Sequence, residues 1–153
     1  MKTMNDPVHW RKSLPRPGSE THKHSRGRLG VVTGPALQTG AARLAARAGL
    51  RIGAGLVRLL CPPDAALVVA GAVEAIMVDV FNTPDVLMRL AEPLDTVVIG
   101  PAAGLNEATA NHVQALAQTG ATLVIDADAI SLYAGRSGDL FACLDRDDVL
   151  TPH

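Results

Sequence analysis

Two aspartates, Asp126 and Asp128, stand two residues apart where an apolar run ends and a loop begins. At the end of a strand, carboxylates with this spacing can hold a metal–phosphate group or accept a hydrogen bond from a ligand hydroxyl. The structural alternative is that one carboxylate caps the following turn and the other is solvated. From the residues alone, both interpretations stay open.

Two glycine-containing segments, residues 34–40 and 100–104, lie at similar junctions between an apolar run and a helical pattern. Glycine lets the backbone approach a ligand closely, and the free amides at a helix N-terminus favour an anion. The first segment is neither a P-loop, since no Gly-Lys-Ser/Thr follows, nor a GxGxxG motif, since its glycine spacing differs. Open α/β sheets bind ligands at such junctions, but an ordinary tight turn is the alternative for each segment.

Strands and helices must position these junctions, and the sequence from residue 29 onward predicts such elements. Apolar runs suited to buried strands alternate with helical patterns, which is typical of an α/β fold with a mostly parallel sheet covered on both faces. The expected strands span 29–33, 56–61, 75–79, 96–99 and 122–126, with a short sixth at 148–150. The expected helices span 39–52, 65–73, 85–91 and 106–118, with a weak turn at 129–134. Residues 1–28 are a polar lead with one short helical turn near residues 8–14.

The first long helix, at residues 39–52, carries two further features. Thr39 is placed to cap its N-terminus by accepting a hydrogen bond from a free backbone amide of the first turn. Arg43, Arg47 and Arg51 recur every four residues and form one polar stripe. The stripe is either a site for an anion or a partner or, more simply, a solvated face.

Composition excludes several classes of protein. With 153 residues the chain is one domain or part of one, and an aromatic content of 3% predicts a core of Ala, Val, Leu and Ile. A net charge of −1 gives no general attraction to nucleic acid or an anionic membrane, and no apolar run reaches the roughly 18 residues of a membrane span. The distant Cys61 and Cys143, without a signal-peptide pattern, favour a cytoplasmic location. The histidines of residues 1–28 lack a fourth zinc ligand, so we assign no metal ligands.

Several segments, taken together and in order, carry a family resemblance. They are Leu14-Pro15-Arg16-Pro17, Thr21-His22-Lys23, Arg26-Gly27, Thr39–Ala48, Arg51–Val57, Gly100–Gly104, Asp126–Ala129 and Leu150–His153. This series resembles the ADP- or ATP-dependent NAD(P)H-hydrate dehydratases, which have a ribokinase-like fold, and the resemblance covers roughly residues 14–153. The single motifs are weak, but their order and spacing are fairly specific.

The resemblance implies a three-layer α/β/α fold and a repair reaction on nicotinamide cofactors. The substrate is NAD(P)HX, the form hydrated on the reduced ring. The resemblance implies that the added hydroxyl is phosphorylated from ADP or ATP with Mg²⁺ and that phosphate is then eliminated to restore NADH or NADPH. The residues that the match places around the hydrated cofactor are Ala41 or Ala42, Gly104 and His153, with Asp126 and Asp128 at the cleft floor. Lys23 would lie near the rim of the cleft.

The match also implies what this chain does not carry. In the family, Thr-Pro-His continues as Pro-Gly-Glu into a second half with the nucleotide site and a Gly-Thr/Ser-Gly-Asp loop, whose aspartate is the catalytic base. No segment of the 153 residues matches that loop. We therefore expect a polar lead (1–28) and the N-terminal part of a truncated dehydratase domain (29–153), without a catalytic residue and inactive on its own. Ala102 stands where relatives tend to have the second glycine of Gly-Pro-Gly-x-Gly.

Two alternative functions stay open beside the dehydratase. One is a non-catalytic remnant that still binds a nicotinamide nucleotide or a partner, and the other is a different ribokinase-like small-molecule kinase. In each case the expected ligand is a small molecule rather than nucleic acid or a membrane. The strand at 148–150 would present an unpaired edge, and because such edges favour dimerisation we also expect self-association into a homo-oligomer.

Overall fold

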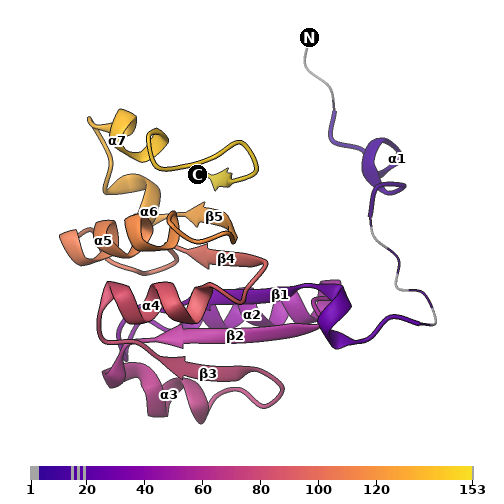
Figure 1. Cartoon of the computed structure of the whole chain (residues 1–153), viewed down its shortest axis with the longest axis horizontal. Helices are drawn as coiled ribbons and strands as arrows, with labels where there is room; N and C mark the ends of the chain where they lie inside the picture. The colour runs from indigo at the N-terminus through magenta and orange to yellow at the C-terminus, as the bar shows by residue number, and fades with distance from the viewer. Residues whose placement is uncertain (1–3, 15, 17, 19, 153) are drawn as a thin grey trace.

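A computed structural model describes residues 4–14, 16, 18 and 20–152 of the chain. Its six strands form one sheet in the order β3-β2-β1-β4-β5-β6, and every neighbouring pair is parallel (Figure 1). Their bounds are β1 (Arg28–Val32), β2 (Leu56–Cys61), β3 (Met77–Val80), β4 (Thr96–Ile99), β5 (Thr122–Asp126) and β6 (Val149–Thr151). The strand order reverses between β1 and β4, which is where open α/β sheets bind ligands.

Helices follow most of the strands, as the alternating pattern predicts. In the body they are α2 (Gly40–Ile52), η2 (Pro63–Ala65), α3 (Ala66–Ala70), α4 (Pro84–Ala91), α5 (Glu107–Leu116), α6 (Asp128–Ser131) and α7 (Ser137–Phe141). The lead contributes α1 (Pro7–Trp10) and η1 (Lys23–Arg26). The predicted elements are confirmed with ends shifted by a few residues, while η1 and α7 were not predicted.

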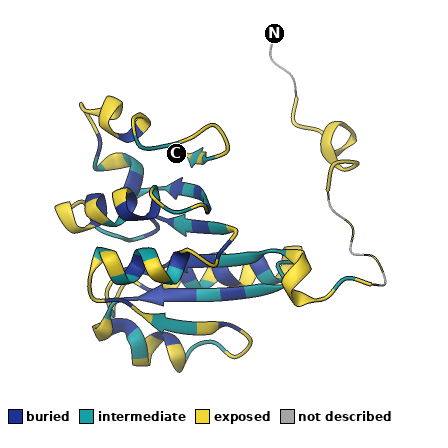
Figure 2. Cartoon of the chain, viewed as in Figure 1, coloured by how far each residue is buried: buried dark blue, intermediate teal, exposed yellow. Residues whose placement is uncertain are grey.

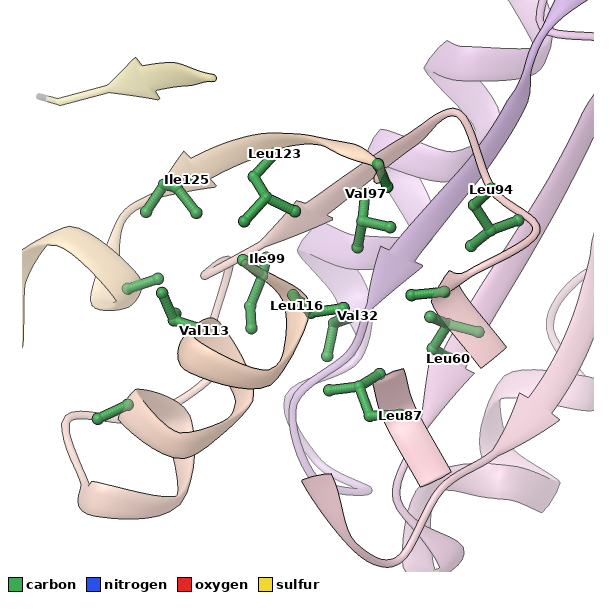
Figure 3. Packing of buried hydrophobic residues seen from close by; sticks show 14 of the residues in the cluster. Val32, Leu60, Leu87, Leu94, Val97, Ile99, Val113, Leu116, Leu123 and Ile125 are labelled. Carbon is green, nitrogen blue, oxygen red and sulfur yellow. The ribbon is translucent and has the colours of Figure 1, made fainter. Parts of the chain in front are cut away.

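The two faces of the sheet carry separate hydrophobic clusters. The larger cluster packs β1, β2, β4 and β5 against α4 and α5 (Figure 3); among its members are Val32, Leu60, Leu87, Ile99, Val113 and Ile125. The smaller cluster packs Val31, Val57 and Leu59 against α2 and α3 on the other face. Figure 1 shows α2 behind β1 and β2, with α4 and α5 in front. Both clusters consist mainly of Ala, Val, Leu and Ile, as the low aromatic content predicts.

Helix α2 lies close to the sheet because its inner face is built from small residues. Ala42, Ala46 and Gly49 are buried, and a Cβ at Gly49 would collide with the side chain of Leu29. The predicted cap of this helix is wrong. Thr39 has helical backbone angles (φ −89°, ψ −10°) and makes no capping hydrogen bond through its side chain, because a side chain caps a helix when its own backbone is extended.

The lead reaches the sheet at the edge where the strands begin. The amides of Gly55 and Leu56 donate hydrogen bonds to the carbonyl of Gly27, just before β1. Helix α1 buries no residue, and the described lead is largely exposed (Figure 2), with Thr21, Gly27 and Arg28 half-buried. Every helix among the described residues falls short of the length and apolar character that a membrane crossing needs.

One ion pair fixes the start of β1 beside β4. Arg28 donates from Nη2 to Oδ1 of Asp95 (2.8 Å) and from Nε to Oδ2 (3.0 Å), and its backbone amide donates to Oδ2 (2.7 Å). The side-chain hydrogen bond from Arg28 holds the pKa of the Asp95 carboxyl below its ordinary value of 3.8. Ionised Asp95 therefore stabilises the folded chain.

We expect Asp95→Asn to lower the urea midpoint of unfolding at neutral pH. A depressed folded-state pKa contributes stability that is present above the unfolded-state value and is lost as the pH falls through the folded-state value. The difference between the wild type and Asp95→Asn should therefore shrink as the pH falls below 3.8, the ordinary pKa of the carboxyl. The exposed Asp147 provides the control, since Asp147→Asn should leave the midpoint unchanged. A difference for Asp95→Asn that is the same at neutral and at strongly acidic pH would contradict the assignment.

Candidate functional site

The loops that follow β1, β4 and β5 touch one another at the carboxyl edge of the sheet. Gly34, after β1, lies so close to the carbonyl oxygen of Ala102 that a Cβ there would collide with it. Gly100, at the end of β4, is packed in the same way against the backbone carbonyl of Asp126. The two glycine segments and the aspartate pair, three separate features in the sequence, therefore form one continuous surface at the strand reversal.

Both aspartates are oriented by hydrogen bonds within this surface. Asp128 accepts a hydrogen bond at Oδ2 from the amide of Gly104 (2.9 Å), which ties the loop after β5 to the loop after β4. Asp126 accepts one at Oδ1 from the hydroxyl of Thr151 (2.8 Å), at the end of β6. Because a carboxylate can accept several hydrogen bonds, these contacts orient the two groups without exhausting their capacity for a ligand.

Two alanines at this surface adopt backbone angles that favour glycine. Among the described residues, Ala102 (φ 56°) and Ala127 (φ 44°) are the non-glycine residues with positive φ. Such conformations cost free energy and cluster at binding and catalytic sites. The sequence offered a signal for Ala102, which stands where relatives tend to have glycine, but none for Ala127.

The N-terminus of α2 faces the same edge, since it follows the loop after β1. The first amides of a helix have no intrahelical acceptor, and in a helix of 13 residues they carry the positive end of the dipole. Ala41 is exposed, whereas the methyl group of Ala42 is fully buried against the sheet. Of the two predicted alanines, Ala42 can therefore reach a ligand only through its backbone amide.

Two other predicted positions lie elsewhere. Lys23 belongs to η1, and its backbone packs against Gly55, next to the first residue of β2. It therefore lies at the amino edge, and its predicted place near the rim of the cleft is wrong because the lead joins the sheet where the parallel strands begin. His153 lies outside the described residues.

Two exposed leucines, which sequence reasoning did not single out, flank the loops. Leu37, in the loop after β1, is 99% exposed, and Leu105, after Gly104, is 66% exposed. Solvent-exposed apolar side chains beside oriented polar groups are typical of a ligand-binding surface. Their exposure depends on loop conformation, which the apolar pattern of the strands does not reveal.

The molecule has two hollows, and one of them borders this surface. That hollow, of about 530 Å³, is an open groove beside α5 and α6 that includes Leu105, Asn106 and Arg136. The other, of about 500 Å³, lies at the amino edge between the lead and the end of α2. Free amides, oriented carboxylates and left-handed backbone gather at the carboxyl edge, which is therefore the candidate site.

The described residues supply neither a metal cluster nor an activated thiol at this edge. They contain no group of three or more His, Cys, Asp or Glu side chains placed to hold a metal ion. Burial, reinforced by Asp64 and Asp79, raises the pKa of the Cys61 thiol to about 11. Cys61 therefore stays protonated at neutral pH and is a poor nucleophile. What the arrangement offers is a place to bind and orient a ligand.

We expect Ala102→Gly to leave the free energy of unfolding unchanged or to raise it by up to about 1 kcal/mol, because relief of left-handed strain offsets the greater freedom of the unfolded chain. Ala48→Gly, at an exposed position in α2, is the matched control and should cost about 1 kcal/mol. Gly34→Ala should cost more than either, because its Cβ meets a backbone carbonyl. Urea unfolding followed by circular dichroism gives the three free energies of unfolding. If Ala102→Gly lowered this free energy as much as Ala48→Gly does, the backbone at Ala102 would not be strained.

Several known proteins share this sequence pattern. The bifunctional NAD(P)H-hydrate repair enzyme Nnr of Coxiella burnetii is 33% identical over 141 residues, which cover 92% of this chain and 28% of that protein. The ATP-dependent (S)-NAD(P)H-hydrate dehydratase of Homo sapiens is 32% identical over 151 residues, which cover 94% of this chain and 43% of that protein. The chain therefore spans less than half the length of these two relatives.

Solved structures show the same fold. A ribokinase-like superfamily protein from Enterococcus faecalis has a TM-score of 0.78 at 24% identity, over 92% of this chain and 50% of that one. The ADP/ATP-dependent NAD(P)H-hydrate dehydratase from Bacillus subtilis, co-crystallized with ATP/Mg²⁺, has a TM-score of 0.71 at 21% identity, over 82% of this chain and 46% of that one. The predicted ribokinase-like α/β fold is thus confirmed.

The family model described as NAD(P)H-hydrate dehydratase (Carb_kinase) matches residues 29–153. This chain belongs to the NAD(P)H-hydrate dehydratase family.

Proposed function

We propose that this chain takes part in the repair of hydrated nicotinamide nucleotides, by binding NAD(P)H-hydrate for its ADP- or ATP-dependent dehydration to NAD(P)H. The observation that carries the proposal is the meeting of the loops after β1, β4 and β5 at the carboxyl edge, where Asp128 accepts a hydrogen bond from the amide of Gly104. The names of the relatives support the choice of substrate and nucleotide. Because the chain spans only part of those relatives, we assign it substrate binding and no catalytic base.

Each group of the site has a chemical task in this proposal. The amides of Gly40, Ala41 and Ala42 at the start of α2 favour an anionic group, such as a phosphate of the nucleotide substrate. Asp126 is oriented to accept a hydrogen bond from a hydroxyl, which suits the hydroxyl added to the nicotinamide ring. Asp128 acts on the ligand indirectly, because it fixes the loop that carries Gly104.

The nucleotide cosubstrate would supply the phosphoryl group that turns the ring hydroxyl into a leaving group. The described residues fit a role in holding the substrate better than a role in holding metal, since Asp126 and Asp128 already accept hydrogen bonds and no larger ligand cluster is present among those residues. Mg²⁺ is usually bound by phosphates and water with one or two carboxylates, so we propose that it would enter with the nucleotide. A cytoplasmic location is part of the proposal, because the substrate is a soluble coenzyme.

We expect hydrated NADPH to bind the purified chain in a calorimetric titration, and Asp128→Ala to weaken that binding about tenfold. A hydrogen bond to a charged group contributes about 1.5–3 kcal/mol, and 1.4 kcal/mol corresponds to tenfold in affinity. Loss of the bond to the amide of Gly104 frees the loop and adds an ordering cost to binding. Unhydrated NADPH should bind more weakly, because it lacks the hydroxyl that would donate a hydrogen bond to Asp126.

Asp147→Ala is the matched control, because Asp147 is exposed and, among the residues that the structure describes, its side chain pairs with the neighbouring Arg146 alone. It should bind hydrated NADPH as the wild type does. Equal affinities for Asp128→Ala and the wild type, or no measurable binding of hydrated NADPH, would remove the proposal. Robust dehydration of hydrated NADPH by this chain with ADP or ATP and Mg²⁺ would show instead that the assignment of no catalytic base is wrong.

A further inference from the structure

The hollow of about 500 Å³ at the amino edge of the sheet lies apart from the candidate site. It opens between the end of α2 and the lead, which meets the sheet where β1 and β2 begin (Figure 1). The candidate site lies at the opposite, carboxyl edge, and the described groups assigned to that site do not line this hollow. A hollow of this size falls in the range of small-molecule binding sites.

The side of the hollow formed by the sheet and α2 is mainly apolar. Leu29 of β1 and Ala54, after α2, are half-buried there, and Ile52, the last residue of α2, is exposed. The amides of Gly53 and Ala54 donate hydrogen bonds to the last carbonyls of α2. Because these carbonyls already have partners, this side of the hollow offers a ligand chiefly hydrophobic contact.

The side of the hollow formed by the lead carries positive charge. Arg16, Arg26 and Arg28 line the hollow, and the charge of Arg28 is neutralised by its ion pair with Asp95. Among the residues that the structure describes, Arg16 and Arg26 form no ion pair, and no acidic residue lines the hollow. Two unneutralised guanidinium groups therefore stand beside an apolar wall.

The hydroxyl groups on the lead side are engaged within the lead. The hydroxyl of Ser25 donates to the carbonyl of His22 (2.9 Å) and accepts from the amide of the same residue (3.1 Å). The hydroxyl of Thr21 donates to the carbonyl of Gly18 (2.8 Å). The polar recognition of a ligand from the lead side therefore falls to the two arginines.

The charges fix the direction in which a ligand would lie. The C-terminus of α2, a helix of 13 residues, carries the negative end of the helix dipole and disfavours an anion. An anionic head therefore belongs beside Arg16 and Arg26. An apolar body belongs beside Leu29 and Ile52. Such a body would remove from water the side chains of Leu14 and Ile52, which line the hollow and are 46% and 82% exposed.

We propose that the hollow at the amino edge binds a small amphipathic anion, in which a phosphate or carboxylate group is attached to a short apolar chain or ring. Arginine suits either head, because its planar guanidinium donates two parallel hydrogen bonds to a phosphate or a carboxylate. The hollow is then a second ligand site of this chain. The inference rests on the lining and charge of the hollow and not on the proposed substrate.

The test titrates the full chain with octyl phosphate, below the concentration at which it forms micelles, and follows binding by calorimetry. We expect saturable one-to-one binding, with amide chemical shifts that change at residues 49–54 and in the lead. Octyltrimethylammonium carries the opposite charge, and inorganic phosphate lacks the apolar body. Each should bind at least tenfold more weakly than octyl phosphate.

Arg26→Gln should weaken the binding of octyl phosphate about tenfold, because it removes a charge-assisted hydrogen bond to the head. Ile52→Ser should also weaken binding, at an exposed position where the change leaves the core intact. Arg11→Gln is the matched control, because it changes the net charge equally at an exposed position of the lead outside the hollow. It should leave the affinity unchanged.

Binding of octyl phosphate that does not saturate, or that is equally tight in Arg26→Gln and the wild type, would overturn the proposal. Equal affinity for octyltrimethylammonium would also overturn it, since apolar contact alone would then account for binding. Loss of octyl phosphate binding in Asp128→Ala would contradict it as well, because the ligand would then lie at the carboxyl edge. Unchanged binding in that variant, whatever its affinity for hydrated NADPH, would support two separate sites.

Discussion

The contact between backbone atoms at the ends of β1, β4 and β5 is the constraint on which the candidate site depends. Gly34 meets the carbonyl of Ala102, and Gly100 meets that of Asp126, with no space for a side chain at either glycine. Because this contact places the loops within hydrogen-bonding distance, Asp128 can reach the amide of Gly104. The polar geometry of the site is thus a consequence of close backbone packing.

The amino edge and the carboxyl edge of the sheet contribute differently to the stability of the fold. At the amino edge, Arg28 and Asp95 form paired hydrogen bonds between adjacent strands without unusual backbone angles. At the carboxyl edge, Ala102 and Ala127 hold conformations that cost free energy. Such strain persists only where surrounding packing enforces it, and here the buried strands on either side supply that packing. A strained edge on a regular sheet is consistent with a binding role for the carboxyl edge.

The strands and their parallel direction could be predicted, because buried strands leave continuous apolar runs that alternate with helical patterns. The position of the candidate site could be predicted because open α/β sheets bind ligands at the carboxyl ends of their strands. Local geometry was less accessible. Thr39 has the right residue type for a cap but the wrong backbone angles, and nothing in the residue type of Ala127 signals a positive φ. Lys23 was misplaced because the resemblance orders motifs along the chain and does not say at which edge of the sheet each one lies.

The sequence of β5 also bears on how the two faces of the sheet are covered. Leu123, Val124 and Ile125 follow one another without a polar residue, although an exposed face would favour alternation. Leu123 and Ile125 are buried in the larger cluster, but Val124 between them is not part of either cluster. An apolar residue at each of these positions indicates a strand selected for cover on both faces. Helices α2 and α3 supply that cover over β1, β2 and β3, so the predicted three-layer arrangement is formed over that half of the sheet.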